Sequence, residues 1–351
     1  MKPQDLVRPE ILALKAYPVA PSEGMVKLDA MENPYTLPEE LRRELAGVLA
    51  RVDLNRYPTP TPQKLLDTLA RRMAVPRGMK LLLGNGSDEL LQIAITALAR
   101  PGAVAMYPSP TFVMYQMSAT FAGMKPVAVP LRDDFTFDAA AFIARMRVEK
   151  PAIVFIAYPN NPTGVLYPEA DLVEVIKACP GLVVIDEAYH AFAGKSFMPR
   201  LPEFENLVVV RTVSKLGLAG IRLGYMAGPP AWIDQFDKLR PPYNIGVLTQ
   251  AAALFMLEKL DVLEAQAARI RADRAALGTG IAALPGTTVF PSEANFLLLR
   301  VTDADRAYES LKRQGVLVRN LHPGLNNCLR VTVGTPDENR ILLAALKEAL
   351  R

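Results

Sequence analysis

The sequence predicts an α/β protein in which a large domain, built on a mostly parallel β-sheet, precedes a smaller α+β domain. Between residues 81 and 211, short apolar runs alternate with amphipathic helical stretches, a pattern typical of a parallel sheet covered by helices on both faces. An Ala/Leu-rich helical region follows at about 248–284. After it, short strands are mixed with two helices, which indicates a second domain of α+β type.

Each apolar run has the length of a strand, and each amphipathic stretch has the length of a helix. The strands of the large sheet are predicted at 81–83, 104–107, 127–129, 153–157, 183–185 and 207–211. The helices between them are predicted at 87–99, 111–121, 138–146 and 169–179. The smaller domain should contain strands at 288–290, 296–300, 316–318 and 329–333, and helices at 304–314 and 337–350.

The Pro-rich stretch before Leu41 has weak periodicity, which indicates an arm. We therefore expect an N-terminal arm at 1–28, a large domain at 29–252 and a small domain at 253–351.

The composition excludes several classes of protein. Half of the 351 residues are hydrophobic and the net charge is only +4, so nucleic-acid binding is not indicated. No apolar run is long enough to cross a membrane and the first residues lack a signal-peptide pattern, so we expect a cytoplasmic protein without a membrane partner. Cys179 and Cys328 are isolated, and His190 and His322 are the only histidines, so no zinc-type cluster can form and we expect no metal.

A glycine-rich loop at Gly84–Ser87 joins an expected strand to an expected helix. Glycines let the backbone approach a ligand closely, and the free N–H groups of the helix start attract an anion such as a phosphate. A dinucleotide-binding loop would need a small residue where Glu89 stands, and the Gly-Lys-Ser/Thr of a Walker A loop does not follow. A phosphate site and a capping turn, with Ser87 or Asp88 at the N-cap, remain equal alternatives.

Three further motifs follow expected strands. The turn Tyr158–Gly164 lies where ligands bind in open α/β sheets, although Asn, Pro and Gly are also turn formers. Asp186 ends a buried strand and needs a partner, which a cationic ring nitrogen, a helix start or an arginine such as Arg211 would supply. Lys215 lies in an apolar, Gly-rich stretch, where burial would lower its pKa and make it a nucleophile; the alternative is a surface lysine.

The order of these motifs carries more information than any one of them. The set comprises LDAMENPY (28–35), NRYPTP (55–60), GNGSDELLQ (84–92), PTFVMY (110–115), NPTG (161–164), DEAY (186–189), SKLGLAGIRLGY (214–225), SEANFLLLR (292–300) and LRVTVGTPDEN (329–339). It resembles the fold-type I aminotransferases that use pyridoxal 5'-phosphate (PLP), over nearly the whole chain. The finer pattern is similar to that of the histidinol-phosphate aminotransferases. The resemblance implies a seven-stranded-type large domain and PLP as cofactor.

The resemblance also implies roles for the residues around the cofactor ring. Lys215 would form the Schiff base with PLP and later move the proton between the substrate Cα and the cofactor C4′. Asp186 would keep the ring nitrogen protonated, so that the ring acts as an electron sink. Tyr189 and Asn161 would bond the phenolic oxygen. Phe112, where the family often has Tyr, would stack on the ring.

The cofactor phosphate would be bound by a second group of residues. By the same resemblance, Ser87, Asp88 and Ser214 surround it within the chain. Arg222 would bind it with a planar guanidinium. Tyr57 would reach it from a second subunit, which implies a homodimer.

The substrate side of the site is implied by two arginines and the N-terminal segment. Arg330 matches the arginine that receives the anionic end of the substrate, and Arg319 matches a second arginine of the histidinol-phosphate branch. Tyr17 and Asn33 would help to close the site. Met31 departs from the family, which commonly has Asn there.

The resemblance implies amino transfer in two half-reactions. L-Glutamate would be converted to 2-oxoglutarate, and imidazole-acetol phosphate would then be aminated to L-histidinol phosphate, a step of histidine biosynthesis. An aromatic amino-acid aminotransferase and a threonine-phosphate decarboxylase are the alternatives on the same scaffold.

Overall fold

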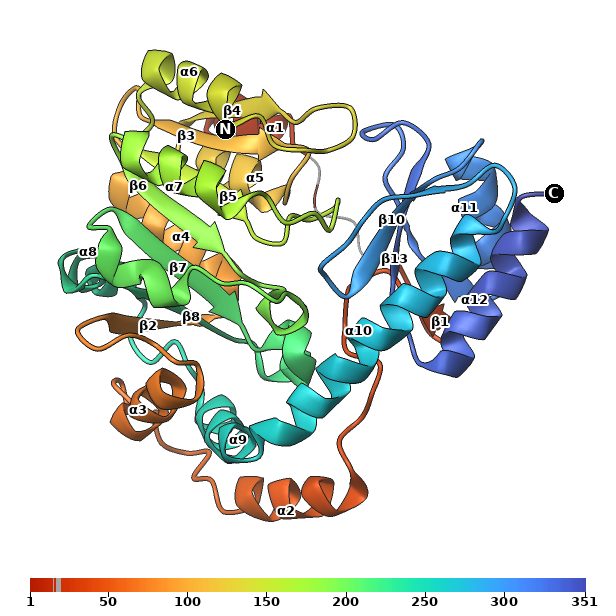
Figure 1. Ribbon diagram of the computed structural model, residues 1–351. Coiled ribbons are helices and arrows are strands. Elements are labelled where there is room, and N and C mark those ends of the chain that lie inside the picture. Colours follow the sequence, from red (N-terminus) through yellow and green to blue (C-terminus); the bar gives the residue numbers. More distant parts are fainter. Residues whose placement is uncertain (15, 17–19) are drawn as a thin grey trace.

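The computed structural model describes residues 1–14, 16 and 20–351. A seven-stranded sheet and a four-stranded sheet form two layered bodies, and a long helix, α10 (Leu260–Ala282), runs from the first to the second (Figure 1).

The large sheet is mostly parallel, as the sequence predicts. Its strands are β2 (Lys80–Asn85), β3 (Val104–Ser109), β4 (Lys125–Pro130), β5 (Ile153–Ala157), β6 (Leu182–Asp186), β7 (Leu207–Thr212) and β8 (Leu223–Gly228). Their order is β2-β8-β7-β6-β5-β3-β4, and only β8 is antiparallel to its neighbours. Every residue of β5, β6 and β7 is buried, because helices cover both faces of the sheet.

Two separate apolar cores explain how the helices attach to this sheet. On one face, α4 (Ser87–Leu98), α5 (Met114–Phe121) and α8 (Pro230–Phe236) bury residues such as Leu90 and Tyr115. On the other face, α3 (Gln63–Arg72), α6 (Ala139–Glu149) and α7 (Glu169–Ala178) bury residues such as Leu69 and Phe142. The second core continues through α9 (Val247–Glu258) and α10 into the C-terminal part of the chain.

The C-terminal part is an α+β body, again as the sequence predicts. Its antiparallel sheet has the order β12-β13-β10-β9. The strands are β9 (Thr288–Val289), β10 (Phe296–Arg300), β12 (Arg319–Asn320) and β13 (Cys328–Thr332), and the helices are α11 (Ala304–Arg313) and α12 (Pro336–Ala349). The expected strand at 316–318 is instead β11 (Val316–Leu317), which pairs in parallel with β1 (Val26–Lys27), so this end of the expected arm lies on the C-terminal body.

Other differences concern element boundaries. The single helical region expected at 248–284 is two helices that meet at Lys259. The expected helix at 111–121 begins only at Met114, and the Thr111 hydroxyl before it donates a hydrogen bond to Asn160 Oδ1. Two further N-terminal helices are α1 (Pro9–Leu12) and α2 (Glu39–Leu49). None of the helices in the described part of the chain combines the length and apolar character needed to span a bilayer.

Candidate active site

The carboxyl ends of the parallel strands meet around one cavity. Loops after parallel strands emerge at the same edge of the sheet, so motifs far apart in sequence converge there. Nine of the expected site residues line this cavity: Ser87, Asp88, Phe112, Asn161, Asp186, Tyr189, Ser214, Lys215 and Arg222. Five further residues line it that the sequence did not indicate as site residues: Met31, Tyr115, Ala157, Ala188 and Thr212.

Asp186 lies at the end of β6 with its carboxylate buried at the floor of the cavity. Burial raises the pKa of Asp186 to about 6, and a hydrogen bond from the Tyr115 hydroxyl to Oδ2, at 2.8 Å, acts in the opposite direction. The Ala188 N–H donates to Oδ1 at 3.1 Å. A buried carboxylate with donors on both oxygens suits a cationic partner in the cavity.

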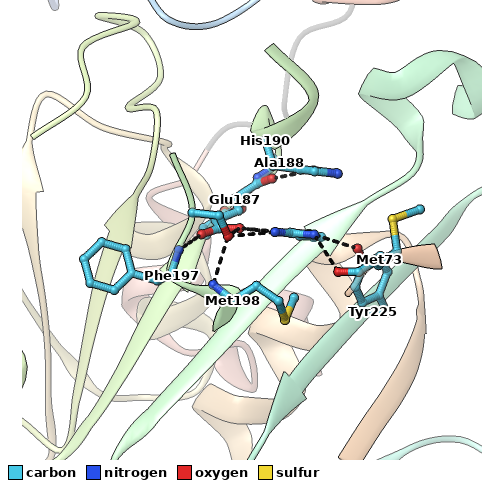
Figure 2. A network of polar contacts seen from close by, with 10 residues as sticks. Met73, Glu187, Ala188, His190, Phe197, Met198 and Tyr225 are labelled. Atoms are coloured by element: carbon cyan, nitrogen blue, oxygen red, sulfur yellow. Dashed lines mark hydrogen bonds and ion pairs between the residues drawn. The ribbon is translucent and has the colours of Figure 1, made fainter. Parts of the chain in front are cut away.

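The alternative pairing of Asp186 with Arg211 is wrong. Arg211 pairs with Glu187, with 2.8 Å between Nη2 and Oε2, and both side chains are buried. Figure 2 shows Glu187 at the centre of a polar network that also includes the Phe197 N–H group. Arg211 reaches the Tyr225 hydroxyl on the other side, at 3.5 Å. This network lies directly after Asp186 and fixes the loop that carries Tyr189.

Lys215 is not a surface lysine, which excludes the alternative raised from the sequence. Its Nζ donates a hydrogen bond to the Ala30 carbonyl at 2.8 Å. Burial and the nearby Arg330 guanidinium lower the pKa of Lys215 to about 8. About a tenth of the amine is therefore neutral near pH 7, far more than for an ordinary lysine, and the neutral form is the one that a nitrogen nucleophile requires.

The glycine-rich loop forms the anion-attracting end of the cavity. Helix α4 begins at Ser87 with Gly86 at the N-cap and no side-chain cap, so the capping role considered for Ser87 or Asp88 is wrong. Gly86 has φ +81°, and a Cβ placed there would lie 2.6 Å from Nη2 of Arg222. Arg222 Nη1 in turn lies 3.4 Å from Ser214 Oγ. A guanidinium, a hydroxyl and free helix N–H groups thus gather at one end.

A chain of hydrogen bonds leads from the small sheet into the cavity. Arg330 Nη1 donates to Asn161 Oδ1 at 2.6 Å, and Asn161 Nδ2 donates to the Tyr189 hydroxyl at 3.0 Å. Arg319 and Arg330 are directly opposite each other on β12 and β13. Side chains directly opposite in an antiparallel pair lie on the same face, so the two guanidinium groups share one face of the small sheet.

The remaining expected site residues lie elsewhere. The amide of Asn33 donates to the Leu216 carbonyl and to Gln266 Oε1, next to the lysine but not among the residues that line the cavity. Tyr57 is 81 % exposed and stacks on Tyr243, with ring centroids 4.7 Å apart. Tyr17 is outside the described residues. The substrate contacts of Asn33 and Tyr17 and the intersubunit contact of Tyr57 stay predictions.

The donor set of the cavity fits PLP. An amine, a buried carboxylate, a phenol with an amide, and an anion-attracting end are all present, matching the aldehyde, ring nitrogen, phenolic oxygen and phosphate of that molecule. The glycines provide the space, since a Cβ at Gly224 would lie 2.6 Å from the Ser87 nitrogen. Among the described residues, no group of three or more His, Cys, Asp or Glu side chains could hold a metal ion.

Comparison with known proteins defines the class and then the branch. A family model described as aminotransferase class I and II matches residues 23–346. The chain is 57% identical to histidinol-phosphate aminotransferase 1 of Burkholderia lata, over 99% of both chains. It is 54% identical to the histidinol-phosphate aminotransferase of Chromobacterium violaceum, over 98% of both chains. The chain therefore belongs to the class I and II aminotransferases, in their histidinol-phosphate aminotransferase branch.

A solved structure supports the same placement. The histidinol-phosphate aminotransferase of Sinorhizobium meliloti, in complex with pyridoxal-5'-phosphate, superimposes with a TM-score of 0.87 and 26% sequence identity. The match covers 99% of this chain and 98% of that one.

Proposed function

We propose that this protein transfers an amino group between L-glutamate and imidazole-acetol phosphate, giving 2-oxoglutarate and L-histidinol phosphate in histidine biosynthesis. The observation that carries the proposal is the arrangement of one cavity: Lys215 and Asp186 both line it, and Arg330 is linked to it through Asn161. The chemistry that bound PLP supplies is a carrier for the amino group and an electron sink for the substrate carbon.

Each residue of the cavity has a defined task under this proposal. Lys215 Nζ would hold the cofactor, and its free amine would move a proton at the substrate Cα; a pKa of about 8 suits both tasks near neutral pH. Asp186 pairs with the ring nitrogen, and Phe112 covers a ring face. Asn161 and Tyr189, already joined at 3.0 Å, hold the phenolic oxygen.

The phosphate end is assigned to Ser87, Asp88, Ser214 and Arg222. A carboxylate would repel a phosphate, so Asp88 would contribute the N–H group that it carries in the first turn of α4. Arg222 lies against Gly86 and near Ser214, which supports the assignment.

The substrate end is assigned to Arg330 and Arg319. A phosphate ester carries more charge and more acceptor oxygens than a carboxylate, so two guanidinium groups on one face suit it. The same pair would receive the distal carboxylate of glutamate. We also propose that the active unit is a homodimer in the cytoplasm; both parts rest on the family resemblance and the composition.

The test is a single half-reaction followed by absorption spectroscopy. Protein loaded with PLP is titrated separately with L-histidinol phosphate, L-phenylalanine and O-phospho-L-threonine. We expect L-histidinol phosphate to convert the cofactor to its amine form at the lowest concentration. Conversion at lower concentration by L-phenylalanine would make the enzyme an aromatic aminotransferase, and carbon dioxide release from phosphothreonine would make it a decarboxylase.

A matched variant tests the role of the second arginine. Arg319→Gln should weaken the binding of L-histidinol phosphate by about 1.5–3 kcal/mol, which is the range for a hydrogen bond to a charged group. This loss corresponds to at least about a tenfold rise in KM. L-Phenylalanine lacks the phosphate, so its KM should change much less. Equal effects on both substrates would contradict the assignment of Arg319 to the phosphate.

A further inference from the structure

Three consecutive main-chain carbonyls contact three buried or half-buried side chains at the edge of the active-site cavity. The Asp29 carbonyl accepts a hydrogen bond from Arg330 Nη2 at 2.8 Å. The Ala30 carbonyl accepts from Lys215 Nζ at 2.8 Å, and the Met31 carbonyl accepts from Asn295 Nδ2 at 2.9 Å. The 29–31 segment therefore contacts both the lysine and the arginine that the proposed reaction uses.

The backbone of this segment is held in an unfavourable conformation. Met31 has φ +53°, in the left-handed region that an unbranched but bulky side chain rarely occupies. Such a conformation is destabilising and persists only where surrounding contacts impose it. Glycine or asparagine would adopt it at lower cost, so other contacts must hold Met31 in place.

Two side chains impose the conformation. The Met31 N–H donates to Thr332 Oγ1 at 3.0 Å, and the Met31 carbonyl accepts from the fully buried Asn295 amide. Thr332 also binds the segment through its main chain, since its N–H donates to the Leu28 carbonyl at 2.8 Å. Thr332 thus holds the N–H group of Met31, and Asn295 holds its carbonyl group.

Strand geometry explains how one strand, β13, influences the position of both Arg330 and Lys215. Arg330 and Thr332 are two residues apart on β13, so their side chains lie on the same face. Arg330 contacts the segment at Asp29, and Thr332 contacts it at Met31. The Ala30 carbonyl between these two contacts is consequently directed toward Lys215.

We propose that Thr332 and Asn295 are positioning residues, which hold the 29–31 main chain so that its carbonyls orient Arg330 and the free amine of Lys215. Neither residue is among those that line the cavity, and neither is assigned a contact with cofactor or substrate. The Ala30 carbonyl contacts the unattached amine, which is the state of Lys215 that would move the proton. The inference rests on the proposed function for the roles of Lys215 and Arg330.

The charges around Lys215 determine what the test should show. Arg330 and Arg222 oppose the charged ammonium, and Glu32 and Asp88 favour it. The Ala30 carbonyl also favours the ammonium, because it accepts a hydrogen bond from it. Loss of that contact should therefore lower the pKa of Lys215 further.

The experiment compares Thr332→Val with Thr332→Ser. Valine has nearly the shape of threonine but no acceptor for the Met31 N–H, whereas serine keeps the oxygen. Cofactor-free protein is mixed with PLP at a series of pH values, and the rate of the absorption change gives the midpoint for the Lys215 amine, which we expect at about pH 8 in the unaltered chain. For T332V we expect a lower midpoint and, through Arg330, a KM for L-glutamate raised by about tenfold, equivalent to about 1.4 kcal/mol, with a smaller change in kcat.

The outcomes separate this inference from the proposed function. If the unaltered protein fails to react with PLP through Lys215, the proposed function itself fails. If the unaltered protein reacts but T332V matches it in midpoint and KM, the positioning role is wrong. A lower melting temperature without those two changes also contradicts the positioning role, and so do equal effects of T332V and T332S. A raised midpoint contradicts it as well, because it would mean that water has entered. If T332V does not fold, Asn295→Ala, which removes the other contact, is measured in the same way.

Discussion

At the scale of single residues, the amine of Lys215 carries the largest effect. Lys215→Ala should lower the rate of amino transfer by at least about 10³-fold, because general acid–base catalysis alone contributes about 10²–10⁴-fold and the covalent attachment is lost as well. Single-turnover absorption measurements with L-glutamate would show it. Lys215→Arg is the control for charge, and it should be equally slow because a guanidinium is neither a nucleophile nor a base at neutral pH. A fast reaction in either variant would contradict the role of Lys215.

The second residue-scale prediction concerns Tyr115. Its hydroxyl donates to Asp186 and holds the pKa of that carboxyl below the value that burial alone would give. In Tyr115→Phe the pKa of Asp186 therefore rises above about 6. The carboxylate form of Asp186, which we propose as the partner of the ring nitrogen, is present above this pKa and is lost as the pH falls through it. As the pH is lowered, the affinity for the cofactor should therefore begin to fall at a higher pH in the variant than in the unaltered protein.

The size of the Tyr115 effect follows from the hydrogen bond. If the lost hydrogen bond contributes about 1 kcal/mol, PLP should bind to Tyr115→Phe roughly fivefold more weakly near pH 6. Equilibrium titration with PLP between about pH 5 and about pH 8, followed by absorption, would measure it. Tyr107→Phe is the matched control, since its ring neighbours Tyr115 at 6.4 Å between centroids but does not line the cavity. Identical pH profiles for both variants would refute the prediction.

Motif order predicted most of the cavity lining, but it did not predict the contacts between motifs. Tyr115 stands in the quoted PTFVMY motif without a role, because its bond to Asp186 spans 71 residues. In the sequence Met31 differs only as a departure from the family, and its left-handed φ depends on Asn295 and Thr332, which follow it by about 260 residues or more. Such contacts depend on how distant strands pack, which local pattern does not encode.

At the scale of elements, the turn before α4 depends on Gly86. A Cβ there would meet the Arg222 guanidinium at 2.6 Å and would be strained at φ +81°. Gly86→Ala should therefore displace Arg222 and weaken the binding of PLP by about tenfold, which corresponds to the loss of one charge-assisted hydrogen bond. Gly220→Ala is the control, because a Cβ at Gly220 would meet no atom within 4 Å. Equilibrium dialysis with PLP measures both, and equal affinities would contradict the prediction.

The loop after β6 depends on the buried pair of Glu187 and Arg211 (Figure 2). Glu187→Gln leaves the Arg211 charge buried without its counter-ion, so the free energy of unfolding should fall by about 3–5 kcal/mol. Urea unfolding followed by circular dichroism would measure the change. Glu203→Gln, in the exposed pair with Arg200, should have little effect. A small loss in Glu187→Gln would mean that water solvates Arg211 there.

Strands with a continuous apolar pattern were predictable, and β8 was not. Residues 223–228 read LGYMAG, and the first three of them are the end of the SKLGLAGIRLGY motif (214–225), so the strand is not set apart from this motif as a separate apolar run. The short strand β1 was also missed, because its two residues pair with β11 almost 300 residues away. Strand pairing over such separations is set by packing of the whole chain.

At the scale of the whole molecule, the predicted boundary between 252 and 253 falls inside α9 (Val247–Glu258). The break between α9 and α10 is at Lys259, and both helices contribute to the core that continues into the C-terminal body. The domain limits stay a prediction. Limited proteolysis cannot cut within an intact helix, so cleavage near 259 but not near 252 would move the boundary to the helix junction.

Tyr57 is the residue through which we predict that a second subunit completes the active site. Its ring is 81 % exposed and stacks only on Tyr243 of the same chain among the ring contacts of the described residues, and it does not line the cavity. If it completes the cofactor phosphate site of a second subunit, Tyr57→Ala should weaken PLP without altering the Lys215 environment of its own chain. A PLP titration of Tyr57→Ala at several protein concentrations tests that step.

Subunit mixing then decides whether the site is shared. In a hybrid dimer of one Lys215→Ala chain and one Tyr57→Ala chain, one site lacks both groups and the other site has both. Random mixing makes about half of the dimers hybrids, so two proteins that are each inactive at limiting PLP should together regain about one quarter of the activity per subunit. Lys215→Ala mixed with a double variant of Lys215 and Tyr57 is the control and should stay inactive, since every site then lacks the lysine. Recovery in the first mixture requires Tyr57 to act across the interface. No recovery, with exchange of subunits verified by mass spectrometry, would place Tyr57 outside the active site and remove the main reason for expecting a dimer.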